Sequence, residues 1–215
     1  PAGLNAAYQL AIKGYAVTVF DMMPEMGGML RYGIPEYRLP KAVLDQEIAM
    51  IADMGVEMKP NFKVGKDASF ADIRSQFDAT VIAIGAWTSM KAGVPGEELE
   101  GVMGGIEFLQ KVAQGQPVDI GDKVAVVGGG NVAMDAARCA KRMGAEHVYI
   151  VYRRSEAEMP ARLEEVHHAK EEGIEFHLLR NPVKIIDDGN GQVCGIECLK
   201  MELGEPDASG RRSPV

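Results

Sequence analysis

The chain has 215 residues, 47% of them hydrophobic and 25% charged, so it can bury a core in one large domain or two modest ones. Its formal net charge of -8 would repel a phosphate backbone, which argues against nucleic acid as a partner. The 3 cysteines lack the close spacing of a zinc or iron–sulfur site, and no apolar stretch is long enough to span a bilayer. We therefore expect no bound metal, no membrane partner and a cytoplasmic location.

The first half of the chain alternates helical and extended patterns. These patterns predict, in order, a helix at 4–13, a strand at 16–20, a Gly- and Pro-rich loop at 24–40, a helix at 41–54, an extended segment at 56–64 and a short helix from Ser69. A continuous apolar run at 79–84 is typical of a strand buried on both faces of a parallel sheet. Residues 85–105 are rich in glycine and predict a connection between two units.

The second half repeats this order more completely. It predicts a strand at 123–127, a helix at 132–143, a strand at 147–152, a helix at 160–172, a strand at 174–178 and, after a break at Pro182, a hairpin of 183–187 and 192–201. The fold class is therefore α/β, with two nested Rossmann-like dinucleotide-binding units. We expect a first domain over 1–100 and a second over 101–215.

A glycine-rich turn joins the strand at 123–127 to the following helix. Gly128, Gly130 and Ala133 match the G-x-G-x-x-G/A pattern, in which the glycines permit a tight turn and the close approach of a pyrophosphate. Helix N–H groups at Asn131 and Val132 are placed to bind the diphosphate. A similar turn can also exist for packing alone, but here strand, turn, helix and next strand occur in the required order.

Two arginines follow the next strand, where an NAD-selective domain usually carries an acid. Arg153 and Arg154 favour the 2′-phosphate of NADPH through charge-assisted contacts, and Arg162 is a candidate for a third contact. The alternative is a solvated arginine pair without a ligand.

These motifs resemble the small chain of NADPH-dependent glutamate synthase and the related flavoprotein halves of dihydropyrimidine dehydrogenase and ferredoxin:NADP oxidoreductases. The resemblance rests on PAGL at 1–4, VTVFDMMPEMGGMLRYGIPEYRLPK at 17–41, DATVIAIGA at 78–86, GVPGEELEGV at 93–102, GGGNVAMDAAR at 128–138, YRRS at 152–155 and MPAR at 159–162. It implies a glutathione-reductase-like fold and FAD as a second cofactor. The FAD-contacting positions implied by the resemblance are Asp21, Gly27, Gly28, Met29, Arg38, Val64 and Gly85.

The first strand of the family's FAD fingerprint is absent, so the sequence resembles a fragment with a truncated first unit, which as given is expected to bind FAD poorly or not at all and to be inactive by itself. The resemblance implies hydride transfer from NADPH to FAD, and onward electron transfer through iron–sulfur clusters to a larger subunit. Glutamate synthesis from glutamine and 2-oxoglutarate, with the glutamate synthase large chain as partner, is the leading interpretation. A ferredoxin-like acceptor, a pyrimidine-reducing subunit and a dinucleotide-binding module without turnover remain alternatives. Hydride transfer requires orientation rather than a general base, so we expect no catalytic acid, base or nucleophile.

Overall fold

The computed structural model describes residues 1–206, 208 and 212–215. Its contacts divide the chain into two compact units, residues 1–86 and 87–215. The division lies earlier than 100/101 because the connecting segment is bonded to the second unit. The Pro95 carbonyl accepts a hydrogen bond from Ile185 N at 2.9 Å, and the Glu100 carbonyl accepts one from Val193 N at 2.9 Å.

The first unit packs helices beside a small parallel sheet. Its elements are α1 (Ala2–Ile12), β1 (Thr18–Phe20), α2 (Met29–Tyr32), α3 (Lys41–Asp53), β2 (Glu57–Lys59) and α4 (Phe70–Gln76). Helix α1 buries Leu4 and Ala7 where it contacts α3 and β1. Helix α4 begins with a capping box, in which the Ser69 hydroxyl accepts from Asp72 N at 3.1 Å and the Asp72 carboxylate accepts from Ser69 N at 3.2 Å. These helices confirm the predicted ones, and α2 is an addition inside the predicted loop.

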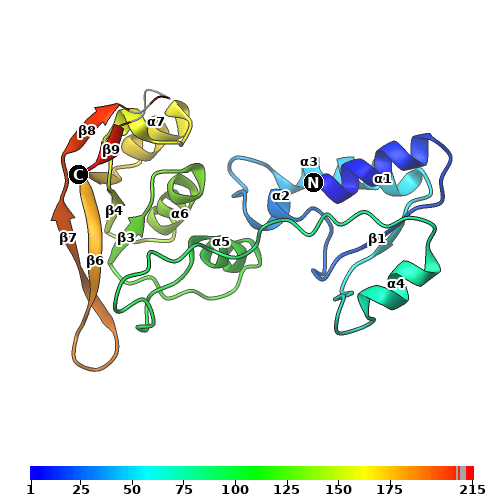
Figure 1. The fold of residues 1–215 in the computed structure, drawn as a ribbon, viewed down its shortest axis with the longest axis horizontal. Helices are drawn as coiled ribbons and strands as arrows, with labels where there is room; N and C mark the ends of the chain where they lie inside the picture. The colour runs from blue at the N-terminus through cyan, green and yellow to red at the C-terminus, as the bar shows by residue number, and fades with distance from the viewer. Residues whose placement is uncertain (207, 209–211) are drawn as a thin grey trace. The chain divides into compact units, whose positions relative to one another are not determined.

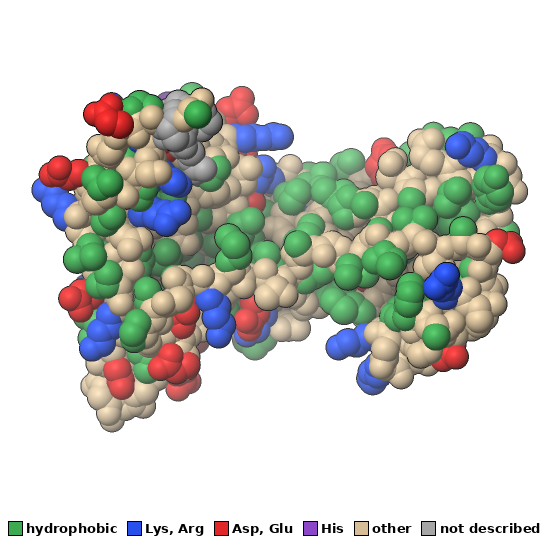
Figure 2. Space-filling view, in the orientation of Figure 1, with side chains coloured by type: hydrophobic (Ala, Val, Ile, Leu, Met, Phe, Trp, Pro, Cys, Tyr) green, Lys and Arg blue, Asp and Glu red, His purple; other side chains and the backbone are tan. Residues whose placement is uncertain are grey.

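The predicted strand at 79–84 is wrong. Within the described chain these residues form no strand, and Val81, Ile82 and Ile84 are 61%, 66% and 78% exposed. A strand needs a neighbour to accept its backbone hydrogen bonds, and β1 pairs only with β2 among the described strands. Hydrophobic side chains accordingly lie exposed on the surface of this unit (Figure 2).

The second unit is built on a parallel sheet of order β3-β4-β5, with α6 against β3 and β4 (Figure 1). Its elements are α5 (Gly105–Ala113), β3 (Lys123–Val127), α6 (Asn131–Arg142), β4 (His147–Tyr152), a 3-10 turn (Glu156–Glu158), α7 (Leu163–Glu171), β5 (Glu175–Leu178), β6 (Arg180–Asp187), β7 (Val193–Lys200), β8 (Leu203–Pro206) and β9 (Arg212–Pro214). Strands β3 and β4 have the predicted bounds. Met134 of α6, Val148 and Ile150 of β4 and Val166 of α7 are fully buried and form the centre of this core.

Four features of this unit differ from the sequence prediction. Helix α5 and the pair β8–β9 were not predicted, and α7 begins at Leu163 rather than near residue 160. Pro182 lies inside strand β6 instead of ending the preceding segment, and the pairing of β6 with β7 shifts register between Pro182 and Lys184. Proline has no N–H to donate, so an irregular position is where a paired strand accommodates it. The predicted antiparallel hairpin itself is confirmed.

No helix in the described part of the chain combines the length and the apolar character needed to cross a membrane.

Candidate dinucleotide-binding site

The turn between β3 and α6 is closed tightly by its first glycine. Gly128 has a φ of +146°, and its N–H donates to Val151 O at 3.0 Å. A Cβ added to Gly128 would lie 3.4 Å from the Cβ of Ala133, which is itself buried. The small residues at both positions therefore allow the first turn of α6 to approach the end of β3.

The second glycine, Gly129, is packed directly against an aromatic ring. A Cβ at Gly129 would lie 2.7 to 2.9 Å from three ring carbons of Tyr152. The Tyr152 hydroxyl donates to Glu158 O at 3.0 Å, which fixes the ring. Tyr152 therefore links the glycine-rich turn to the segment after β4, a role that sequence reasoning missed although Tyr152 directly precedes the arginine pair.

The third glycine is less crowded than the first two. A Cβ at Gly130 would find Pro160 Cγ, at 3.9 Å, as its nearest neighbour, and no side chain caps the N-terminus of α6 in the described chain. Uncapped N–H groups and the positive end of the helix dipole favour an anion. The N–H groups of Asn131 and Val132 therefore fit a diphosphate that approaches over Gly130, while Ala133 N donates to Gly130 O at 3.0 Å and its small side chain allows the close packing.

Residues 159–162 are bonded directly to this turn. Ala161 N donates to Gly129 O at 3.1 Å, and Arg162 N donates to Asn131 Oδ1 at 2.9 Å. Arg162 is exposed and precedes helix α7. The structure thus brings Arg162 beside the first turn of α6, and the Asn131 side chain is one of the two groups that hold it there.

The arginine pair lies immediately after β4. Arg153 is exposed, and no hydrogen bond or ion pair of its side chain occurs among the described residues. Arg154 is half-buried, its Nε donates to Arg212 O at 3.1 Å, and its carbonyl accepts from Leu179 N at 3.2 Å. Arg153 is therefore the more available of the two guanidinium groups for an anionic ligand.

In the first unit, Asp21 follows β1 and forms a turn. Its Oδ1 accepts from Met23 N at 2.9 Å, and its backbone joins Lys59 and Phe62. One carboxylate oxygen is engaged by this turn, which leaves the other as an acceptor suited to a ribose hydroxyl.

Three of the segments implied by the resemblance meet at the start of α1. A Cβ at Gly28 would lie 3.2 Å from Pro1 Cδ, and one at Gly3 would lie 3.5 Å from Ala83 Cβ. Gly27 and Gly28 have φ values of +129° and +56°, and Gly85 has +70°. The side chains that the Cβ atoms at Gly28 and Gly3 would meet are the small ones of Pro1 and Ala83, and glycines with these backbone conformations fit the close approach of a diphosphate.

The other predicted FAD positions are more scattered. The Met29 carbonyl accepts from Gly33 N and Ile34 N, both at 3.0 Å, and Arg38 N donates to Pro35 O at 3.0 Å. Val64 is 44% exposed and forms an isolated bridge with Ala68. Among the described residues, no group of three or more His, Cys, Asp and Glu side chains is placed to hold a metal ion.

The chain belongs to the pyridine nucleotide-disulphide oxidoreductase family, whose model matches residues 1–208. It is 47% identical to subunit beta of an NADPH-Fe(3+) oxidoreductase from Geobacter sulfurreducens, over all of this chain and 33% of that protein. It is 40% identical to the small chain of Escherichia coli glutamate synthase [NADPH], over 99% of this chain and 47% of that protein. The chain therefore spans a third to a half of the length of these relatives.

Among solved structures, FprA from Mycobacterium tuberculosis (a His57Gln mutant) matches with a TM-score of 0.80 at 19% identity, over 99% of this chain and 64% of that chain. This match confirms the predicted α/β fold. The family match confirms the expected family of NAD(P)H-dependent oxidoreductases, whose cofactors are NADPH and FAD. The resemblance to the glutamate synthase small chain is likewise confirmed.

Proposed function

We propose that this chain is the electron-input part of an NADPH-dependent flavoprotein, which transfers a hydride from NADPH to FAD and passes the electrons to a partner subunit. The observation that carries the proposal is the glycine-rich turn of the second unit. It combines a Gly130 with room for a ligand, a helix N-terminus without a side-chain cap, and the segment that carries Arg162, which is hydrogen-bonded to the turn. These are the features that recognition of a dinucleotide phosphate requires.

NADPH is preferred to NADH in this proposal because the position after β4 carries cations instead of an acid. The exposed guanidinium groups of Arg153 and Arg162 would bind the 2′-phosphate. The Arg154 guanidinium already donates one hydrogen bond to the Arg212 carbonyl and would contribute less. An NADH ribose offers these groups only hydroxyls, so the energetic gain is smaller.

FAD bound to the first unit would accept the hydride and release the electrons one at a time. The residues of this chain orient the two cofactors and supply no proton. Gly27, Gly28 and Met29 would line the flavin diphosphate, Asp21 would accept from the adenosine ribose, and Arg38, Val64 and Gly85 would complete the contacts with FAD. In the second unit Gly128, Gly130, Asn131, Val132 and Ala133 would bind and orient NADPH for transfer of its hydride.

The acceptor in this proposal is a larger subunit, and the glutamate synthase large chain is the leading candidate because of the similarity to the small chain of that enzyme. The higher identity to an NADPH-Fe(3+) oxidoreductase subunit favours a second candidate, in which the electrons reduce an iron centre. In both cases the same number of electrons is transferred for each NADPH: two electrons reduce either the imine formed from 2-oxoglutarate and glutamine-derived ammonia, which also takes up protons, or two ferric ions. NADPH loses a hydride and becomes NADP⁺, and each hydride provides two electrons to the acceptor.

Anaerobic stopped-flow mixing of the FAD-loaded full-length protein with NADPH tests the reductive step. We expect bleaching of the flavin absorbance, faster and at lower concentration with NADPH than with NADH. Adding glutamate synthase large chain with glutamine and 2-oxoglutarate, or a ferric acceptor, then distinguishes the two acceptors by which one restores the absorbance. A protein that binds NADPH but never reduces a flavin would instead be a dinucleotide-binding module without turnover.

A further inference from the structure

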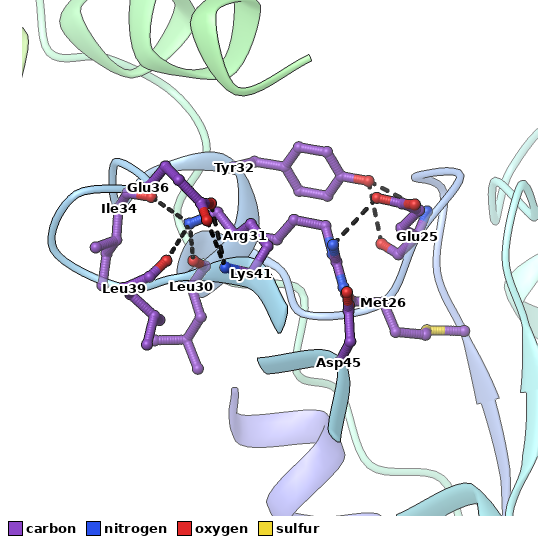
Figure 3. A network of polar contacts seen from close by, with 10 residues as sticks. All are labelled: Glu25, Met26, Leu30, Arg31, Tyr32, Ile34, Glu36, Leu39, Lys41 and Asp45. Atoms are coloured by element: carbon purple, nitrogen blue, oxygen red, sulfur yellow. Dashed lines mark hydrogen bonds and ion pairs between the residues drawn. The ribbon is translucent and has the colours of Figure 1, made fainter. Parts of the chain in front are cut away.

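The loop that precedes α3 in the first unit is held by a lysine whose ammonium makes only internal contacts. Lys41 Nζ donates to Leu30 O at 3.1 Å, to Ile34 O at 2.6 Å and to Leu39 O at 3.1 Å (Figure 3). An ammonium group has three N–H donors, so these carbonyls use all of them. Lys41 therefore has no donor left for a ligand and instead fixes the path of residues 30–39.

The start of α3 is fixed from the other side by Glu36. Both carboxylate oxygens of Glu36 accept from Lys41 N at 3.1 Å, so the loop folds back on the first turn of the helix. Burial lowers the pKa of the Lys41 ammonium below its ordinary value, while the nearby Glu36 carboxylate opposes that shift. The charged form of Lys41 is thus favoured by the Glu36 carboxylate, while its ammonium donates to the three loop carbonyls.

A second cation holds the beginning of the same loop. Arg31 is buried, its Nε donates to Met26 O at 2.7 Å, and its guanidinium pairs with Glu25 at 3.2 Å and with Asp45 of α3. Tyr32 adds a further closure, because its hydroxyl donates to Glu25 O and accepts from Glu25 N, both at 3.1 Å (Figure 3).

These contacts enclose the Gly27-Gly28-Met29 turn. A Cβ on Gly27 would lie 3.2 Å from Arg31 Cβ and 3.0 Å from Leu44 Cδ2, so the turn rests on the arginine and on α3. The Met29 carbonyl accepts from the N–H groups of Gly33 and Ile34, and Ile34 is one of the residues bound by Lys41. The geometry of the turn is therefore connected to both cations without any ligand.

We propose that Lys41 and Arg31 are positioning residues that hold the Gly27-Gly28-Met29 turn in its binding shape before FAD arrives. The inference rests on the proposed function, since FAD is taken as the ligand of this turn. Ordering a loop removes backbone conformational entropy at each residue that becomes fixed, which opposes binding. If the loop is already ordered in the free protein, this entropy is lost on folding and not on binding, so the affinity for the cofactor is higher.

The test compares Lys41→Met with Lys41→Arg and with a control, Lys13→Met, in the full-length protein. Lys13 is exposed at the end of α1, so its loss removes a charge without touching the loop. Three quantities are measured: amide hydrogen exchange over residues 25–40 in flavin-free protein, the Kd for FAD and the Kd for NADPH.

We expect Lys41→Met to lose exchange protection over residues 25–40 and to bind FAD about tenfold or more weakly, with an unchanged Kd for NADPH. Lys41→Arg should recover most of the FAD affinity, because a guanidinium also donates to several carbonyls. Lys13→Met should match the wild type. If Lys41→Met fails to fold, Tyr32→Phe replaces it, since that variant removes one loop closure and should produce a smaller change in the same direction.

Unchanged exchange protection in Lys41→Met would overturn the inference, and so would lost protection with an unchanged Kd for FAD. If the wild-type protein binds no FAD, the proposed function of the first unit fails together with the flavin role of Lys41. The hydrogen exchange comparison still shows in that case whether Lys41 shapes the loop, so the two failures are distinguishable.

Discussion

Replacing Gly129 by alanine tests whether the ring of Tyr152 fixes the glycine-rich turn. The new methyl would lie 2.7 to 2.9 Å from three carbons of that ring, well inside van der Waals contact. Tyr152 is 8% exposed and its hydroxyl donates to Glu158 O, so the ring cannot move away without losing that hydrogen bond. Overpacking of this kind typically costs about 1–3 kcal/mol, and we expect the free energy of unfolding of the second unit to fall by this amount.

Gly130→Ala is the matched control, because the same methyl one residue later finds its nearest neighbour at 3.9 Å. Gly130 has φ -94° and ψ 175°, which alanine adopts freely, so stability without nucleotide should stay equal or rise by about 0.4–1 kcal/mol. That methyl would occupy the space over which the diphosphate approaches, and the Kd for NADPH should rise about tenfold or more, which corresponds to about 1.4 kcal/mol.

Urea unfolding without nucleotide and calorimetric titration with NADPH separate the two effects. Adding Tyr152→Leu to Gly129→Ala should recover part of the lost stability, because the smaller side chain relieves the contact and the two changes are then not additive. The reasoning is refuted if Gly129→Ala unfolds like the wild type, or if Gly130→Ala binds NADPH with wild-type affinity.

Three further predictions concern charged residues of the second unit. Arg153→Ala should raise the Kd for NADPH roughly 10- to 100-fold and barely alter that for NADH, since a hydrogen bond to a charged group contributes about 1.5–3 kcal/mol; equal losses in calorimetry would contradict it. Arg138→Met should lower the free energy of unfolding in urea by about 3–5 kcal/mol, because it removes the guanidinium 2.8 Å from the buried Glu165 carboxylate, and a loss within experimental error would count against this pair. The hydrogen bond from Arg142, together with Arg138, lowers the pKa of Glu172 in the folded state. The ionised Glu172 therefore stabilises the fold fully above the ordinary pKa of 4.5, and this stabilisation is lost as pH falls through the lower folded value. Glu172→Gln should flatten the dependence of unfolding free energy on pH in that range, and an unchanged slope would show that other groups cause it.

The parts of the candidate site that lie close together in sequence could be predicted. The bounds of β3 and β4 follow from their apolar runs, and the positions of Gly128, Gly130 and Ala133 follow from the spacing of small residues between strand and helix. The hydrogen bond from Arg162 to Asn131 could not be predicted in this way. It joins residues 31 positions apart, and no pattern within either segment specifies the partner.

The same distinction between local and distant partners explains the error at residues 79–84. A helix satisfies its own backbone, so α1, α3 and α6 could be predicted from periodicity alone. A strand forms its backbone hydrogen bonds with a neighbouring strand. An apolar run indicates that such a strand would be buried, but it does not show whether a partner strand is present beside it. The contacts of Lys41 are also ones that the sequence does not reveal. Its ammonium is satisfied by three carbonyls of an irregular loop, and those carbonyls belong to the backbone, so residue identity carries no sign of the contact until the loop is folded.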